Sequence, residues 1–124
     1  MTTLTTVEVL RGAKAVLERN GWHQGSLYDI TQLATGTPRN ECRVCLVGAF
    51  CVAASGDPVG RNIQTDAAWD AVVHALDERG LLFADSPIAD WNDEPGRTVG
   101  EVFELLDEAI ALAENTNNTT GGTK

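Results

Sequence analysis

The chain has few basic residues, and this shortage argues against nucleic acids as partners. Nine lysines and arginines stand against eighteen aspartates and glutamates, which gives a net charge of −9. Residues 63–124 hold three basic and thirteen acidic side chains, a net charge of −10, whereas residues 1–62 stand at +1. Because the acidic half should repel phosphates, we expect no direct binding to nucleic acid.

Long apolar runs and secretion signals are also missing. No window reaches the roughly 18 consecutive apolar residues that a membrane-spanning helix needs. The first six residues carry neither a basic segment nor an apolar run. We therefore expect no signal peptide, no membrane contact and a cytoplasmic location, where the cysteines stay reduced.

Motifs that mark common enzymes and metal sites are absent as well. The sequence has no phosphate-binding loop, no nucleophile elbow and no zinc-protease motif. Cys42 and Cys45 form a C-x-x-C pair, but a structural zinc needs four ligands and no second pair exists. We interpret Cys45 and Cys51 as small core residues and predict no metal and no cofactor. This favours a protein without catalytic activity, although an enzyme that lacks such motifs stays open.

What the sequence does contain is helical periodicity. Its 124 residues predict one domain, and apolar residues recur at helical spacing in four segments. Two of these begin with a capping box, in which two residues three apart satisfy each other's backbone amides. The boxes are Thr5 with Glu8 and Thr98 with Glu101. The predicted helices cover Thr6–Asn20, residues 44–55, residues 65–79 and Val99 to about Glu114.

These segments predict a mainly α fold, a compact bundle of about four helices. The helix over 44–55 is apolar on nearly all sides, and Gly48 and Ala49 within it would let a neighbouring backbone approach closely. A small β-hairpin between Leu27–Ile30 and Glu41–Val44 is an option. We expect a single globular domain over residues 1–114 and a disordered polar tail over 115–124.

The densest polar segment is Trp91–Thr98, which precedes the last helix. Pro95 and Gly96 fix its path. One interpretation is structural: Trp91 packs over the edge of the core, and Asp93 or Glu94 accepts from backbone amides or pairs with Arg97. The other is a contact surface over the acidic region 85–108, because tryptophan and arginine are enriched in binding hot spots.

A second polar loop, Trp22–Tyr28, also adjoins a helix end. If the two loops meet, they would frame a pocket for a small molecule or a substrate. Such a pocket would combine His23, Tyr28, Asp93 and Arg97. The candidate binding residues are Trp91, Asn92, Asp93, Arg97, Trp22, His23 and Tyr28.

Four pieces of the chain together resemble a known protein family. They are Leu10–Trp22, Gln24–Asp29, Cys45–Ala49 and Trp91–Thr98, in that order. The pattern is similar to a family of short uncharacterised proteins, a domain of unknown function, from actinobacteria and their phages. The resemblance implies an accessory-gene product with a regulatory or host-interaction role, and it supplies no catalytic residue.

The function favoured by these observations is that of a small acidic interaction or regulatory protein that is not an enzyme. Its partner would be an unidentified protein, from a host or from the same cell, and a homodimer built on residues 44–55 is a further option. The alternative is a small-molecule-binding or enzymatic domain with its pocket between the two tryptophan-bearing loops.

Overall fold

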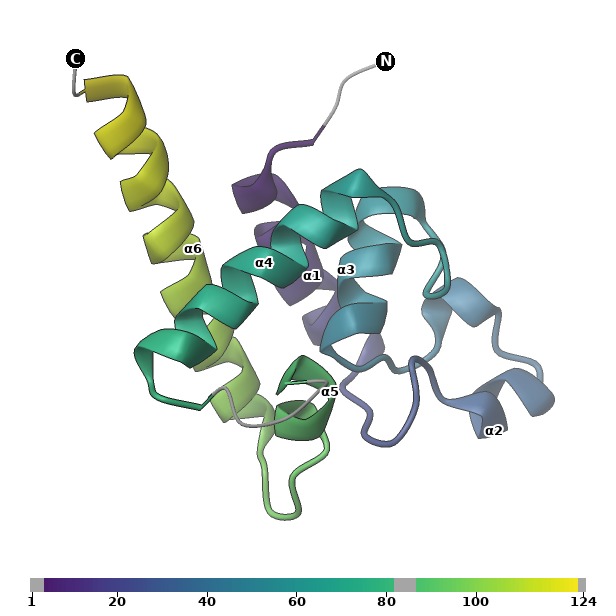
Figure 1. Cartoon of the computed structure of the whole chain (residues 1–124). Coiled ribbons are helices and arrows are strands. Elements are labelled where there is room, and N and C mark those ends of the chain that lie inside the picture. The colour runs from purple at the N-terminus through teal and green to yellow at the C-terminus, as the bar shows by residue number, and fades with distance from the viewer. Residues whose placement is uncertain (1–3, 82–86, 123–124) are drawn as a thin grey trace.

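A computed structural model describes residues 4–81 and 87–122, with side chains as far as residue 115. The fold is mainly helical, at 67%, which confirms the predicted class. The described residues form six α-helices and no strand (Figure 1). The elements are α1 (Thr6–Asn20), α2 (Ile30–Ala34), the 3-10 helix η1 (Arg39–Glu41), α3 (Leu46–Ser55), α4 (Ile63–Glu78), α5 (Pro87–Asn92) and α6 (Val99–Gly122).

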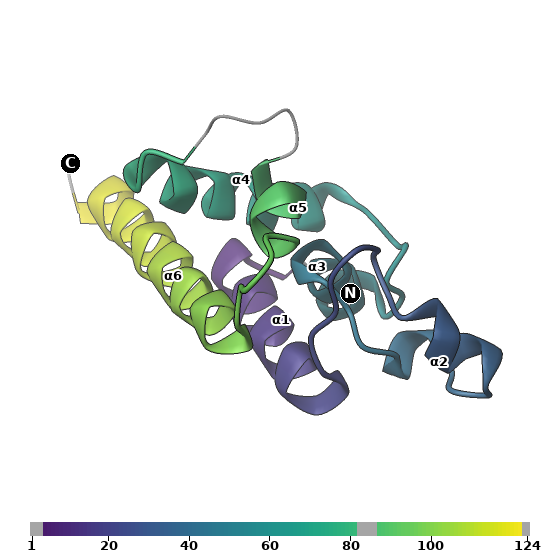
Figure 2. The same ribbon diagram turned by 90° about the horizontal axis from the view of Figure 1, so that it is seen from below.

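Four of the helices enclose the core. α1 contacts α3, α4 and α6, and α4 contacts α3 and α6 as well, while the short α5 packs on α3 and α4. Seen from below, α1 and α6 lie side by side and α2 stands apart at the opposite end from α6 (Figure 2). The largest fully buried side chains include Phe50, Leu10, Leu46, Leu76, Ile88, Leu105 and Leu106.

The capping boxes form as the sequence predicts. Thr5 Oγ1 accepts from Glu8 N, and Glu8 Oε1 accepts from Thr5 N at 2.8 Å. The same exchange joins Thr98 and Glu101 at the start of α6. Each box satisfies two amides that a helix start leaves without partners, so these two helix starts are fixed by local sequence.

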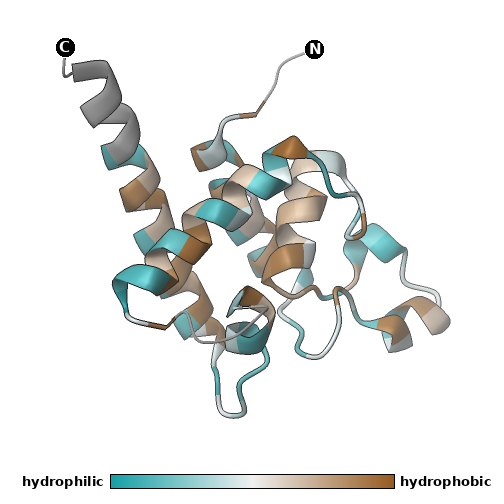
Figure 3. Ribbon diagram, in the orientation of Figure 1, coloured by the Kyte–Doolittle hydropathy of each residue, from teal (hydrophilic) through white to brown (hydrophobic). Residues whose placement is uncertain are grey.

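α3 is the buried helix predicted for the apolar run, although it begins at Leu46. Most of its length is coloured as hydrophobic, whereas α4 and α6 alternate between hydrophobic and hydrophilic residues (Figure 3). Its buried residues pack within one chain, against α1, α4 and α5. Their apolar character is therefore accounted for without a second copy, and a homodimer stays a prediction.

The β-hairpin is not confirmed. Val44 forms only isolated bridges, parallel to Trp22 and antiparallel to Tyr28. Pairing stops there because the next residue, Cys45, already caps α3, and Asp29 caps α2. A bundle of four helices is not confirmed either, since α2 and α5 add two short helices that the periodicity did not indicate.

The start of α4 and the end of α6 differ from the predicted bounds. α4 begins at Ile63, because Asn62 and Thr65 form a capping box that we did not predict. α6 continues to Gly122 and not to about Glu114, and no glycine or proline interrupts residues 101–120. The division into a globular domain over 1–114 and a disordered tail over 115–124 stays a prediction. Residues 123–124 lie outside the described part of the chain.

Candidate functional site

A buried amide side chain joins the two tryptophan-bearing loops. Asn92, at the end of α5, is 1% exposed. Its Oδ1 accepts from Trp22 Nε1 at 2.8 Å and from Leu46 N at 3.1 Å. Its Nδ2 donates to His23 O at 3.1 Å and to Asp93 Oδ1 at 2.9 Å. Both donors and both acceptor sites of the amide are thus used, and they tie the first loop, the start of α3 and the end of α5 together.

Further hydrogen bonds link the loops on either side of Asn92. Gln24 Nε2 donates to Asn92 O and to Glu94 O, both at 3.0 Å. Gly25 N donates to Asp93 Oδ1 at 2.9 Å. Gly25 has a φ of +100°, a conformation that glycine adopts readily. The structure therefore brings the two loops together through Trp22, His23, Asn92 and Asp93.

The first loop also passes closely over the start of α3. Cys45 N donates to Leu27 O at 3.2 Å, and Cys45 Sγ accepts from Gly48 N at 3.5 Å. A Cβ atom on Gly48 would lie only 2.2 Å from Leu27 O. The close backbone approach predicted at Gly48 is thus real, and the approaching segment is the loop that carries the candidate site.

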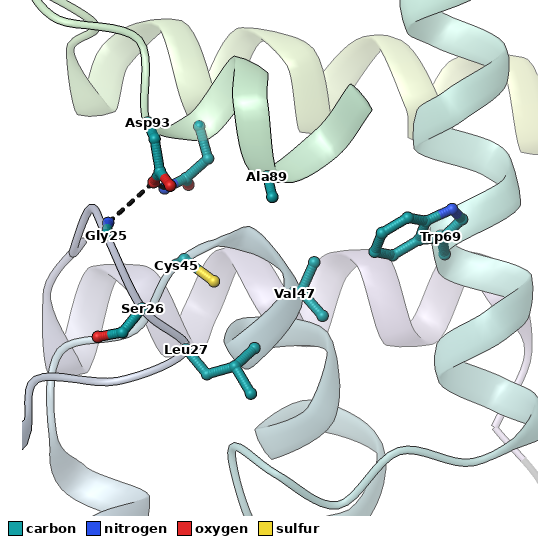
Figure 4. Close-up of a pocket in the computed structure, with 9 residues that line it drawn as sticks. Gly25, Ser26, Leu27, Cys45, Val47, Trp69, Ala89 and Asp93 are labelled. Carbon is teal, nitrogen blue, oxygen red and sulfur yellow. Dashed lines mark hydrogen bonds between the residues drawn. The ribbon is translucent and has the colours of Figure 1, made fainter. Parts of the chain in front are cut away.

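A cavity of about 260 Å³ opens beside this junction. Its walls come from the first loop, the start of α3, α4 and α5, and most of its lining is apolar (Figure 4). In that view the sulfur of Cys45 points into the space, and Asp93 and Trp69 lie on opposite sides of it. The lining residues are Gly25, Ser26, Leu27, Cys45, Val47, Trp69, Ala89, Asn92 and Asp93.

The cavity thiol is held in its protonated form. Burial raises the pKa of Cys45 above its usual value, and the nearby Asp93 carboxylate raises that pKa further. Hydrogen bonds from the amides of Gly48 and Val47 act in the opposite direction without reversing the shift. Because the thiolate is the nucleophile, Cys45 is weakly reactive at neutral pH.

Trp91 and Arg97 lie elsewhere and are engaged with each other. Trp91 is 7% exposed and belongs to the core. The Arg97 guanidinium lies 3.9 Å from the Trp91 ring centroid, and Arg97 Nε donates to Trp91 O at 2.9 Å. Arg97 Nη1 also lies 3.5 Å from Glu101 Oε2. The packing of Trp91 is that of the structural interpretation, whereas the carboxylate beside Arg97 is Glu101 and not Asp93 or Glu94. Within the proposed contact region 85–108, residues 85–86 lie outside the described part of the chain.

His23 and Tyr28 do not line the cavity. His23 Nε2 lies 3.1 Å from Ser26 Oγ, a contact within its own loop. Tyr28 packs against the core and bridges to Val44. Of the four residues proposed to form a pocket together, the cavity lining contains only Asp93.

Sequence reasoning missed several lining residues. Trp69 falls on the inner stripe of α4 and Ala89 on a helix that was not predicted, so neither carries a signal of its own. Cys45 was interpreted only as a core residue, whereas its sulfur caps α3. The one usable signal was Gly48, because a glycine inside an apolar helix can mark a close approach.

Comparison with known proteins gives a family. The family model described as "Family of unknown function (DUF6197)" matches residues 1–112. The chain belongs to DUF6197. This membership agrees with the resemblance to a domain of unknown function and assigns no activity. No curated protein and no solved structure matches the chain.

Two further findings apply to the described part of this DUF6197 chain. None of its helices combines the length and apolar character needed to cross a bilayer. Among the same residues, no three histidine, cysteine, aspartate or glutamate side chains gather where they could hold a metal ion. Cys42, Cys45 and Cys51 are free and buried.

Proposed function

We propose that this protein acts by binding a small molecule in the cavity beside Asn92. The observation that carries the proposal is the convergence of the two loops, which leaves an apolar space of about 260 Å³ with polar groups at its edge. Ligand pockets are typically concave and apolar with a few polar groups that fix orientation. The volume lies just below their usual range of about 300–1,000 Å³, so the ligand is small.

Binding fits the cavity better than catalysis does. The amide of Asn92 is fully occupied by contacts within the chain. The Cys45 thiol, with its raised pKa, is a poor nucleophile, and the histidine nearest in the loop, His23, faces Ser26. Nucleophilic catalysis needs a base beside an activated nucleophile, and the lining offers no such pair among the described residues.

Filling the cavity tests the proposal. Ala89→Leu places extra volume into the space, and Ala67→Leu makes the same change on α4, beside a separate groove. Benzyl alcohol, a small neutral probe, is titrated while amide and indole signals are followed by NMR. In the wild type and in Ala67→Leu, we expect saturable changes in the NMR chemical shifts of Gly25, Val47 and the Trp69 indole. In Ala89→Leu, we expect no such changes. Equal shifts in all three proteins would refute the cavity as the site.

A protein partner is a second candidate, favoured by charge. Seven lysine and arginine side chains already pair with carboxylates of the same chain. With a net charge of −9, the remaining carboxylates are available to a basic surface. The resemblance to proteins of actinobacteria and their phages supports a regulatory or host-directed role in the cytoplasm.

Charge reversal separates a specific acidic contact from general attraction. Glu104 lies in the acidic half of the chain and Glu41 in the nearly neutral half, and both residues are exposed. Each is replaced by lysine. Capture of the partner from host extract is compared for the two variants and for the wild type at high salt. A partner that binds the acidic half should be lost with Glu104→Lys and at high salt. It should be retained with Glu41→Lys. Equal retention by both variants would contradict this candidate.

A further inference from the structure

One exposed carboxylate, that of Asp93, lines the cavity and has one oxygen to which the described residues donate no hydrogen bond. Asp93 lines the space, and both hydrogen bonds that its side chain accepts, from Gly25 N and Asn92 Nδ2, go to Oδ1. The described residues therefore donate no hydrogen bond to Oδ2. A carboxylate oxygen is an acceptor only, so a ligand that complements the cavity brings a donor to this atom.

The surroundings make a cationic donor the best match. Asp90 and Glu94 are exposed neighbours of Asp93 in sequence and add negative charge. Arg61 lies on the Trp69 side of the cavity, with its Cζ atom 5.7 Å from the centroid of the Trp69 ring. Its charge is already paired, because its Nε lies 2.8 Å from Asp66 Oδ1.

The start of α3 does not reverse this balance. A helix N-terminus attracts anions through its free amides. Here Leu46 N is bound by Asn92 Oδ1 and Gly48 N by Cys45 Sγ, so these two amides are already occupied. Asp93 lines the same cavity as Cys45, the N-cap of this helix, so its negative charge disfavours an anionic ligand there.

We propose that the ligand is a small apolar amine. This rests on the proposed function and adds the ligand's chemical class. The ammonium group binds Asp93 Oδ2, and the hydrocarbon body lies against Leu27, Val47 and Trp69. The cavity volume of about 260 Å³ admits one ring or a short branched chain. A free amine and the lysine side chain of a partner share this chemistry, and the test includes both.

Three probes of similar size but different charge test the ligand class. Benzylamine, benzyl alcohol and benzoate are titrated separately into the wild-type protein, with the NMR signals of Gly25, Val47 and the Trp69 indole as the readout. We expect benzylamine to bind about fivefold more tightly than benzyl alcohol, since hydrogen bonds to charged groups are stronger, and benzoate not to bind. Acetylated lysine methylamide represents the lysine side chain of a protein partner. If it binds more weakly than benzylamine, the ligand of the cavity is a free amine and not a partner's lysine.

Two variants of matched charge assign the preference to Asp93. Asp93→Asn keeps an oxygen for Gly25 N and removes the charge, and Glu94→Gln removes one charge from the adjacent exposed residue. The preference for the amine over the alcohol should vanish in Asp93→Asn and persist in Glu94→Gln. Thermal melting of each variant shows whether it is folded. If Asp93→Asn does not fold, the comparison of the three probes on the wild-type protein still tests the ligand class.

The outcomes separate this inference from the function on which it rests. Equal binding of amine and alcohol in the cavity would overturn the amine and leave the proposed function intact. No cavity shifts with any probe would overturn both. A preference that survives in Asp93→Asn would overturn the assignment of the ammonium to that carboxylate.

Discussion

At the scale of single residues, Asn92 is the side chain on which the junction depends. Its amide satisfies the Trp22 indole and the first amide of α3 at once, in a nearly solvent-free position. Removing one partner from a buried hydrogen bond leaves the other unsatisfied, at a cost of about 1–3 kcal/mol each.

We therefore predict that Asn92→Ala lowers the free energy of unfolding by about 3 kcal/mol, because the buried Leu46 amide and the partly buried Trp22 indole lose their acceptor. Urea denaturation measures the loss. The control is Asn20→Ala, which removes an exposed hydrogen bond to Asn40 O and should cost less than about 1 kcal/mol. Similar losses for both variants would mean that Asn92 is an ordinary helix-end residue.

Trp91 distinguishes the structural corner from a contact surface. Because the ring is buried beneath the Arg97 guanidinium, Trp91→Ala should reduce stability by about 3–5 kcal/mol. Thermal or urea unfolding measures this effect. A Trp91→Ala protein that melts at nearly the wild-type temperature would instead favour an exposed binding role for the ring.

At the scale of elements, the loop over the start of α3 sets the cavity's shape. Gly48→Ala would place a Cβ 2.2 Å from Leu27 O, so the loop would have to move. We predict a loss of about 1–3 kcal/mol, measured by urea denaturation, together with altered NMR signals at Gly25 and Leu27. Gly100→Ala has ordinary contact distances in α6 and should be neutral or stabilising by up to ~1 kcal/mol. Equal stability of Gly48→Ala and Gly100→Ala would contradict the close contact between Gly48 and Leu27 O.

The cap of α2 gives a dependence on pH. Asp29 accepts from Thr31 N, Gln32 N and the Arg43 guanidinium, and the hydrogen bond from Arg43 holds the pKa of this carboxyl below its ordinary value. A lowered folded-state pKa contributes stability that is present above the unfolded pKa of about 3.9 and is lost as pH falls through the folded value.

We predict that Asp29→Asn is less stable than the wild type at neutral pH and that the difference shrinks below about pH 4. Urea denaturation at both pH values measures it. Asp70→Asn, at an exposed position on α4, is the control for general charge effects. A difference between wild type and Asp29→Asn that stays constant with pH would show that the carboxyl is not stabilised in the folded state.

Prediction from sequence succeeded where structure is local. Apolar spacing located α1 and α6, and the two capping boxes set their first residues. It failed where geometry depends on distant contacts. Val44 looked like a strand residue, but Cys45 caps α3 and ends the pairing at one bridge on each side.

The candidate site was predictable only in outline. The two polar loops do meet, yet the residue that joins them is Asn92 and not an ionisable group of the proposed pocket. Trp69 and Ala89 line the cavity because α4 and α5 pack beside it. Their local sequence gives no indication of this position. Arg97 appeared suited to a site, whereas its partner turned out to be the adjacent Trp91.

At the scale of the whole molecule, one apolar core between α1, α3, α4 and α6 supports a cavity at its edge. Among the described residues, every buried side-chain nitrogen and oxygen has a hydrogen-bond partner. The site that we propose for function is the space next to Asn92, in a chain with a net charge of −9.

The most direct test of this account is to locate a bound probe by intermolecular NOEs. With benzylamine in excess, we predict NOEs from its ring protons to the methyl groups of Leu27 and Val47 and to the Trp69 ring. NOEs confined to the separate groove formed by Trp22, Val99 and Phe103, or no NOEs at all, would contradict the cavity as the binding site.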